Sequence, residues 1–379
     1  MPTGNPTSVK SIILGVSLLL AIAACSTTTT ALEEQPATPD APVPPPSSAT
    51  SAPPTTEPSF TTNNPTTSRP EPGPAWLKGQ LHLHTSNSLD TSTPAEEMIR
   101  TYEELGFDFI VITDHVQTTD RTDHVGPMRV YVGVELSQEA DVCDPRPHDP
   151  GTQCRIHVSS LFSATRPHDG INWAPFPDGS TLGVSKFLVE TAQMLGGLPM
   201  INHPSQYWAV DGPLLIEQIR MGAVLVEIAN LALPEWSFGT TVHPSPEAIW
   251  DEAALSGANI FGVATDDAHD PSDAGLGWVM VQAENTEEAI KAALLAGRFY
   301  SSSGVTLTRI QVTGADLIIE IDSPVVHTIE FIADGGEVLA TIEGTSASFG
   351  FPSDTPLMRA VVTSPAGEKA WTQFLSRES

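Results

Sequence analysis

Basic residues are scarce in this chain of 379 residues, which has 17 Lys and Arg against 46 Asp and Glu and a formal charge of −29. Such a surface repels phosphate backbones and anionic lipid headgroups, so nucleic-acid binding through a basic face is excluded. The sequence has only one long apolar run, which excludes a multi-spanning membrane protein. Its 34 prolines are clustered, which excludes a collagen-like chain.

The one long apolar run, Ile12–Ala24, follows a short segment with Lys10 and is too short to span a bilayer. A charged start, a core of this length and small residues at its end are typical of a secretory signal. The end, Ile22-Ala23-Ala24-Cys25, resembles the bacterial lipobox, in which the Cys is lipidated. We therefore expect residues 1–24 to be a lipoprotein signal and Cys25 to anchor the exported protein to the cell envelope. An ordinary cleaved signal is the alternative.

Residues 25–75 are dominated by Thr, Pro, Ser and Ala, with Phe60 as their only aromatic residue. This composition cannot bury a core and predicts a disordered tether. Beyond the tether the sequence has two cysteines, Cys143 and Cys154, which we expect to pair in an oxidising compartment. A zinc site is the alternative, but zinc sites favour Cys pairs two to four residues apart, together with a second pair.

Strand and helix patterns alternate between Trp76 and Gly304, which predicts an α/β domain over residues 76–304. The predicted strands are Gly79–His84, Phe107–Asp114, Val130–Glu135, Arg155–Phe162, Leu198–His203, Val224–Asn230 and Ile260–Thr265. Helical spacing occurs in Pro94–Leu105, Lys186–Met194, Leu214–Met221, Pro246–Leu255 and Glu287–Ala296. Such alternation predicts a parallel sheet, and seven units over ~230 residues fit a seven-unit (β/α) barrel.

Residues 305–379 have short period-two runs separated by turns, with no helical pattern between them. The runs are Arg309–Val312, Leu317–Ile321, His327–Ile332, Val338–Ile342 and Leu357–Val362. They predict a small antiparallel β-sandwich domain. We expect it to pack against the barrel, with a ligand-binding accessory module as the alternative.

Histidines and acids recur at the carboxyl ends of the predicted strands. His82 and His84 are two residues apart on one strand, so both rings project from the same face and can bind one metal ion. In a parallel barrel these strand ends meet at one mouth, where loops assemble a site. The other residues that end or follow predicted strands are His115, Glu135, His203, Asp267 and His269. Their convergence predicts a metal centre.

Five ordered motifs run through residues 78–304: His82-Leu83-His84, Thr113-Asp114-His115, Glu135, Asn202-His203-Pro204 and Asp267-Ala268-His269. In this order they resemble the PHP superfamily of metallohydrolases, named for polymerase and histidinol phosphatase. Gly297-Arg298-Phe299-Tyr300 and Ala370-Trp371 look like its carbaryl-hydrolase-like branch. The resemblance implies a distorted seven-unit barrel that holds two or three divalent metal ions, of Zn, Mn or Fe.

The resemblance also implies how the ligands are shared. A first metal would be bound by His82, His84, Glu135 and Asp267. A second would be bound by Glu135, His157 and His203, and a third by Asp90, His115 and His269.

Two of these ligands have rivals in the sequence. His157 opens its predicted strand instead of ending it, so it reaches the mouth only if that strand runs or bends differently from the others, and His148 is the alternative. Asp266 adjoins Asp267, and the Asp-x-His spacing selects Asp267 as the ligand. We expect Asp266 and Asp114 to support the ligands from behind, Asp114 by orienting a ring.

The predicted centre suits hydrolysis by a metal-bound hydroxide, for which no side-chain nucleophile is needed. We expect a divalent-metal-dependent phosphoesterase that acts on a small-molecule ester. The alternatives are a carboxylic or carbamic ester hydrolase on the same site and a metal-binding lipoprotein without turnover. Few basic residues lie in the predicted mouth loops, Arg121 being the nearest. Four aromatic residues suit an apolar leaving group or, equally, loop packing: Tyr207, Trp208, Trp236 and Phe238.

Overall fold

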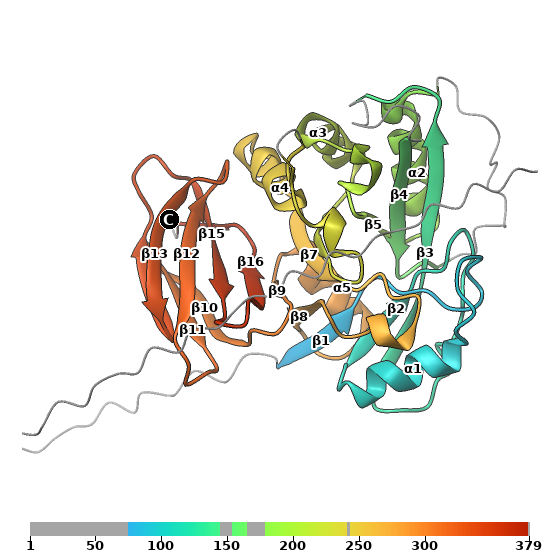
Figure 1. The fold of residues 1–379 in the computed structure, drawn as a ribbon, viewed down its shortest axis with the longest axis horizontal. Helices are drawn as coiled ribbons and strands as arrows, with labels where there is room; N and C mark the ends of the chain where they lie inside the picture. The colour runs from blue at the N-terminus through green and yellow to red at the C-terminus, as the bar shows by residue number, and fades with distance from the viewer. Residues whose placement is uncertain (1–74, 145–153, 165–178, 241–242, 378–379) are drawn as a thin grey trace, which may run out of the picture. The chain divides into compact units, whose positions relative to one another are not determined.

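The protein is described by a computed structural model that covers residues 75–144, 154–164, 179–240 and 243–377. The chain divides into Met1–Ser68 and a compact unit, Arg69–Ser379, which contains all the described residues. That unit is a mixed α/β fold with five α-helices and two sheets among its described residues (Figure 1). The predicted signal, Cys25 and nearly all of the predicted tether lie outside the described residues.

Nine strands build the first part of the large sheet. They are β1 Trp76–Gln80, β2 Phe109–Ile112, β3 Arg129–Ala140, β4 Cys154–Leu161, β5 Leu198–Ile201, β6 Leu225–Asn230, β7 Phe261–Thr265, β8 Trp278–Gln282 and β9 Phe299–Ser302. The seven strands predicted from the sequence correspond to β1–β7, whereas β8 and β9 were not predicted. Two predicted ends are wrong: β1 ends at Gln80, before His82 and His84, and β3 continues past Glu135 to Ala140. Along the sheet the order is β9-β8-β1-β2-β3-β4-β5-β6-β7.

The expectation of a wholly parallel sheet is wrong at β4. Strands β1–β2–β3 and β5–β6–β7 pair in parallel, but β4 is antiparallel to both β3 and β5. The reason lies in the connection from β3, which the Cys143–Cys154 disulfide closes with Cα atoms 5.4 Å apart. Cys154 pairs in register with Ala140, so the chain turns back beside β3 instead of crossing over the sheet. The predicted disulfide is thus present.

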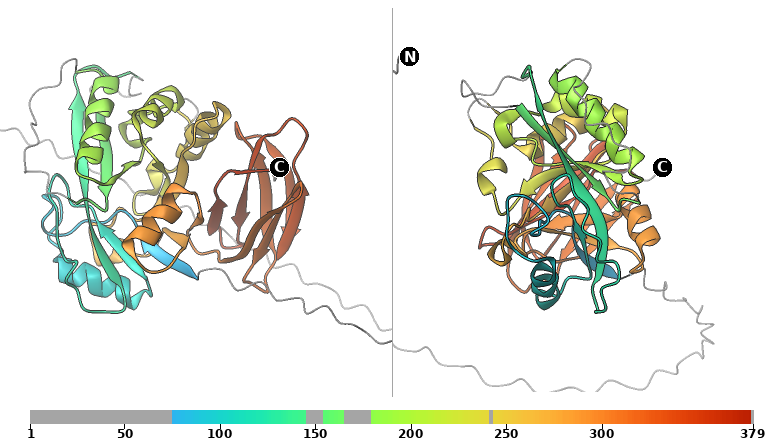
Figure 2. Two further views of the ribbon diagram at one scale, coloured as in Figure 1. Left: turned by 180° about the vertical axis from the view of Figure 1, so that it is seen from behind. Right: turned by 90° about the vertical axis from the view of Figure 1, so that its right-hand side faces the viewer.

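The five helices match the predicted ones to within a few residues. They are α1 Ala95–Glu104, α2 Thr181–Met194, α3 Gly212–Met221, α4 Pro246–Leu255 and α5 Glu287–Leu295. In α2–α5 the residue before the helix accepts a hydrogen bond from a first-turn backbone N–H; these residues are Ser180, Asp211, Ser245 and Thr286. Helix α2 lies against β3 and β4 (Figure 2), where Val184 and Leu188 join a buried apolar cluster.

The two ends of the β1–β7 run meet beside the predicted ligands. The chain that continues β1 forms a parallel bridge between Leu83 and Ala268, in the segment that follows β7. His84 N donates to Ala268 O at 2.8 Å, and Asp267 N donates to His82 O at 3.0 Å. These bonds bring the predicted ligands of β1 and of β7 together through the backbone alone.

Side chains provide hydrogen-bond partners for backbone groups at the outer edge of β7. Ala264 N donates to Ser301 Oγ at 3.1 Å, and Gly262 exchanges two hydrogen bonds with the Gln373 amide, both at 2.9 Å. The backbone groups of this edge strand are therefore paired, as buried peptide groups must be.

Eight strands follow β9 in the described residues, and five of them continue the same sheet. The eight are β10 Leu307–Thr313, β11 Asp316–Ile321, β12 His327–Ala333, β13 Val338–Gly344, β14 Ser346–Gly350, β15 Leu357–Thr363, β16 Lys369–Thr372 and β17 Leu375–Ser376. Strand β16 pairs with β9, and β15, β12 and β13 follow outward, with β17 also on β15. Strands β10, β11 and β14 form a separate antiparallel sheet. Ile319 of β11 and Phe331 of β12 share one buried cluster, so the two sheets pack on a common core.

A buried guanidinium attaches these strands to the α/β part. Arg359 of β15, 1% exposed, donates to Asp251 of α4 through Nε at 2.7 Å and Nη2 at 2.9 Å. Its Nη2 also lies 3.3 Å from Glu247, and the guanidinium stands 5.1 Å from the Trp250 ring. Removing one partner of such a pair would leave a buried charge without compensation, which is costly. This contact is therefore a strong constraint on where the C-terminal strands lie.

Candidate metal centre

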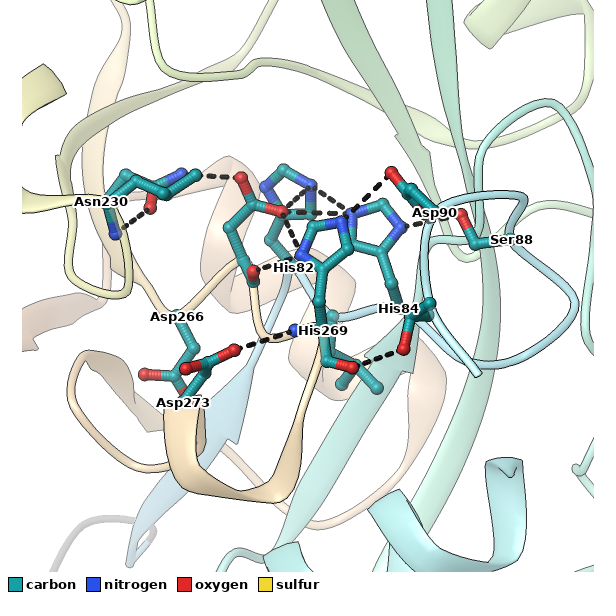
Figure 3. A network of polar contacts seen from close by, with 12 residues as sticks. His82, His84, Ser88, Asp90, Asn230, Asp266, His269 and Asp273 are labelled. Carbon is teal, nitrogen blue, oxygen red and sulfur yellow. Dashed lines mark hydrogen bonds and ion pairs between the residues drawn. The ribbon is translucent and has the colours of Figure 1, made fainter. Parts of the chain in front are cut away.

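All nine predicted ligands gather at one place in the structure. Figure 3 shows how four of them, His82, His84, Asp90 and His269, lie beside one another. Within the described residues the nine form four overlapping groups whose ligand atoms lie within 4.8 Å of one another. The groups are His82-His84-Asp267, His82-Glu135-His203, His115-Glu135-His157 and His84-Asp90-His115-His269. The first and last correspond closely to the first and third metal positions implied by the resemblance, and the middle two share Glu135.

The innermost group consists of two imidazoles and one carboxylate that face one another. His82 Nε2 lies 3.1 Å from His84 Nε2 and 3.3 Å from Asp267 Oδ1, and His84 Nε2 lies 3.0 Å from the same oxygen. His82 Nδ1 is 2.6 Å from Glu227 Oε1, and because an ionised carboxylate only accepts, this ring nitrogen carries the proton. Nε2 of His82 therefore faces His84 and Asp267.

Glu135, near the middle of β3, is the centre of the cluster. Its Oε1 lies 2.8 Å from His157 Nδ1 and 3.2 Å from His203 Nε2. Its Oε2 lies 3.0 Å from His115 Nδ1 and 3.4 Å from the Nε2 atoms of both His82 and His84. The side chain is 1% exposed. A carboxylate with different imidazoles on each oxygen has the geometry of a bridging ligand.

The outer group lies at the solvent boundary. Asp90 Oδ2 is 3.0 Å from His115 Nε2 and 3.1 Å from His269 Nε2. The Asp90 side chain is 42% exposed and that of His269 is 29% exposed, whereas His82 and His84 are fully buried. A molecule from solvent therefore meets this group first.

His157 belongs to the cluster because β4 runs antiparallel to its neighbours. Its register partner is Ser137, two residues beyond Glu135 on β3, so the beginning of β4 lies at the ligand end of the sheet. Ser137 Oγ lies 2.8 Å from His157 Nε2 and holds the ring with Nδ1 toward Glu135. The rival His148 lies outside the described residues.

Asp266 supports the site from behind, as expected. It accepts hydrogen bonds from Tyr102 Oη at 2.8 Å and from the backbone N–H groups of Gly275, Leu276 and Gly277 at 2.7–2.8 Å. Burial outweighs these bonds and raises the pKa of Asp266 to about 6. Its side chain thus ties the loop after Asp267 to α1.

Asp114 plays a different part from the one expected. Its carboxylate accepts from Thr85 N at 2.5 Å, from Thr85 Oγ1 at 2.8 Å and from the Thr119 hydroxyl. No imidazole of the described residues is among its hydrogen-bond partners. The expectation that it orients a ring is therefore wrong, because its position between two loops lets it fasten the chain after His84 to the chain after His115.

The carboxylate that does orient a ring is Glu227 of β6, which the sequence reading missed. Besides His82 Nδ1 it accepts from His203 N at 2.6 Å and from Thr265 Oγ1 at 2.7 Å, and it is fully buried. A buried acid needs partners, so a lone Glu between the aliphatic residues Val226 and Ile228 was the available signal.

Two asparagines, also missed, orient the carboxylates of the ligands. Asn202 Nδ2 donates to Glu135 Oε1 at 2.7 Å, and Asn230 Nδ2 donates to Asp267 Oδ2 at 2.9 Å. Both amides are buried at strand ends, so each fixes one oxygen of a ligand and leaves the other directed into the cluster.

Electrostatics favour the metal-binding form at Glu135 and His157, whereas the carboxylates around His82, His115, His203 and His269 raise the pKa of those rings against the effect of burial. Burial disfavours charge on Glu135, but the rings of His157, His82 and His115 hold its pKa well below the ordinary value. Burial is also the largest influence on His157 and lowers its pKa to about 4, so this ring is neutral near pH 7. A neutral ring and an ionised carboxylate are the protonation states that metal binding requires.

Two buried polar atoms without a hydrogen-bond partner indicate whether a cation would fit between the candidate ligands. Asp267 Oδ1 and His115 Nδ1 are both buried, and neither makes a hydrogen bond within the described part of the chain. Asp267 Oδ1 is nevertheless 3.0–3.3 Å from two imidazole nitrogens. Buried polar atoms are almost always paired, and a metal ion between these atoms would pair them. The donor set of imidazole nitrogens and carboxylate oxygens suits Zn, Mn or Fe.

Of the aromatic and basic residues predicted to lie near the site, the structure describes the side chains of Trp208, Phe238 and Arg121. Trp208 stacks on His243 with ring centroids 4.4 Å apart, and Phe238 is 66% exposed. The side chains of Tyr207 and Trp236 lie outside the described part of the structure. Arg121 is engaged with Glu96 at 3.2 Å.

No protein-family model matches the chain, and no curated protein matches it. The likeness to the PHP superfamily therefore remains a resemblance between motifs.

We predict that Glu135→Ala removes more than one equivalent of bound metal, because its two oxygens face different sets of imidazoles. Elemental analysis of the dialysed protein measures this. His269→Ala, which alters only the outer group, should remove no more than one equivalent, and Glu320→Ala, on an exposed pair with Arg309, should remove none. Full metal content in Glu135→Ala would show that the carboxylate bridges nothing.

Proposed function

We propose that the protein is a divalent-metal-dependent hydrolase of small esters, and that phosphate esters are its principal substrates. The observation that carries the proposal is Glu135, whose buried carboxylate lies within 3.4 Å of five imidazole rings. This arrangement suits a di- or trinuclear centre of Zn, Mn or Fe ions.

Bound divalent cations would lower the pKa of a coordinated water toward neutrality and polarise the ester under attack. The chain's own residues provide the rest. Glu227 holds His82 with its Nε2 atom toward the centre, and Asn230 and Asn202 orient the Asp267 and Glu135 carboxylates. The partial exposure of Asp90 and His269 lets an ester approach from the outer group.

A serine nucleophile is the competing mechanism. Ser88 Oγ lies 3.2 Å from His84 Nδ1, and His84 Nε2 lies 3.0 Å from Asp267, which imitates a Ser-His-Asp chain. However, Ser88 is 3% exposed, and its oxygen accepts a hydrogen bond from His115 N. Ser88 therefore suits the orientation of His84 better than attack on a substrate.

The choice between ester classes rests on charge. Phosphoryl transfer places more negative charge on the reacting group than acyl transfer does, and a cluster of cations stabilises it more. A carboxylic or carbamic ester hydrolase is the alternative, favoured by Trp208 and the exposed Phe238 in the loops after His203 and Asn230. A metal-binding lipoprotein without turnover is the second alternative.

For the fold, we propose a distorted seven-unit barrel of PHP type. The backbone bridge between Leu83 and Ala268 supports it, since that bridge joins the ends of the β1–β7 run, and the reversed β4 is the distortion. We propose a β-sandwich for the C-terminal strands, supported by the cluster that Ile319 and Phe331 share between two sheets.

We also propose that the protein is exported and held at the cell envelope by lipid on Cys25. Support comes from the sequence Ile22-Ala23-Ala24-Cys25 and the Thr- and Pro-rich segment behind it. Among the described residues, no helix is long and apolar enough to span a membrane.

We predict that the metal-loaded protein hydrolyses aryl phosphate esters, and aryl carboxylic or carbamic esters more slowly. Chelation should abolish turnover, and readdition of metal should restore it. Ser88→Ala should retain metal-dependent turnover, whereas His269→Ala should lower kcat by about 100-fold, because it alters the group that meets the substrate.

Steady-state assays on a matched pair of aryl esters decide between the alternatives. Turnover of carboxylic esters alone would reverse the ranking of substrates. A fully metal-loaded protein that acts on neither class would leave metal binding as the function. Complete loss of activity in a metal-loaded Ser88→Ala protein would favour the serine mechanism.

For the anchor, we predict that Cys25→Ala abolishes lipidation, so that the protein is released or remains unprocessed. Detergent partitioning and intact mass measure both effects, with Ser26→Ala as the control. A Cys25→Ala protein that partitions with the membrane at an unchanged mature mass would contradict the proposal.

A further inference from the structure

A second cavity lies far from the metal centre. It has a volume of about 590 Å³ and is bounded by the beginning of β1, the end of β8, the beginning of β9, strand β10 and the chain near β17. Trp76, which lines it, is the first residue of β1, whereas His82 and His84 follow the other end of that strand. At about 3.3 Å per residue, Trp76 is roughly 20 Å from His82 along the strand. The cavity is therefore not part of the metal centre.

The lining of this cavity is basic in a strongly acidic protein. Arg298 and Arg309 both line it, and none of its described lining residues is Asp or Glu. The Arg298 guanidinium is exposed, and no described side chain forms an ion pair with it. Arg309 donates to Gln311 and forms an ion pair with Glu320, each at 2.9 Å. Because Arg298 adds a guanidinium with no ion pair to a wall that has no carboxylate of its own, the cavity offers a local site for an anion.

The remaining lining groups suit an organic anion. Gln311 Oε1 accepts from Arg309 Nε, which leaves its NH₂ group to donate, and Thr308 offers a hydroxyl. Trp76 and Phe299 supply aromatic surface, with Trp76 held edge-on against Tyr300 at 5.1 Å. The volume lies within the ~300–1,000 Å³ of small-molecule sites, which combine apolar walls with a few polar groups.

We propose that this cavity is a binding site for a small organic anion, a carboxylate or phosphate held by Arg298 and Arg309, and that it is separate from the metal centre. The proposal does not depend on the proposed hydrolase activity. Arg298 gives the main contact, because its fork of N–H donors is free to pair with an oxyanion.

Isothermal titration calorimetry of the metal-loaded protein tests the site with benzoate, citrate and inorganic phosphate as probes. At least one should show a binding event that Arg298→Gln weakens by about tenfold or more, since a charge-assisted contact is lost. Arg100→Gln is the matched control, because Arg100 is an exposed arginine of α1 outside the cavity and should leave the affinity unchanged.

Two results would overturn the proposal. One is the failure of all three probes to bind more tightly than about 1 mM. The other is equal affinity in the wild-type and Arg298→Gln proteins, which would place the anion at the metal centre instead. Citrate or benzoate binding with no response to phosphate would identify the ligand as a carboxylate, and the reverse would identify a phosphate.

Discussion

The structure depends on the burial of the Glu135 carboxylate among imidazole rings. Its two oxygens contact five rings, at 1% exposure, and Asp267 adds a second buried carboxylate to the same space. Charges removed from water cost several kcal/mol each unless they are fully compensated. Asp267 Oδ1 and His115 Nδ1 have no hydrogen bond in the part of the chain described. The groups around these atoms could hold metal ions, which would complete the arrangement.

Three features of the fold bring the candidate ligands together around Glu135. The reversed β4 brings His157 to the same end as Glu135, and the disulfide between Cys143 and Cys154 holds that reversal. The backbone pairing of Leu83 with Ala268 joins the ligands of β1 to those after β7. Glu227 contacts both His82 and His203, so one buried acid orients ligands from two different strands. Each device positions donor atoms before any metal binds, which reduces the cost of binding.

Much of this could be predicted from local pattern. The alternation of strands and helices predicted seven strands and five helices, because hydrophobic periodicity is a local signal. Most of the candidate ligands could be predicted because they follow strands with informative spacing, although Glu135 and His157 lie inside β3 and β4. The direction of β4 could not, since strand pairing is a long-range property. Glu227 was missed for a related reason: a single polar residue in an apolar strand gains meaning only from its neighbours in space. Asn202 stood in a named motif, but its hydrogen bond to Glu135 joins residues 67 positions apart.

The central claim is that the cluster around Glu135 binds two or three divalent ions. Anomalous scattering from crystals of the metal-loaded protein, measured on either side of the metal absorption edge, tests it most directly. The account predicts separate peaks, one within about 2–2.3 Å of His82, His84 and Asp267, and another in contact with Glu135 and His157. Crystals of protein that carries metal by elemental analysis, yet with no anomalous peak among these residues, would contradict it.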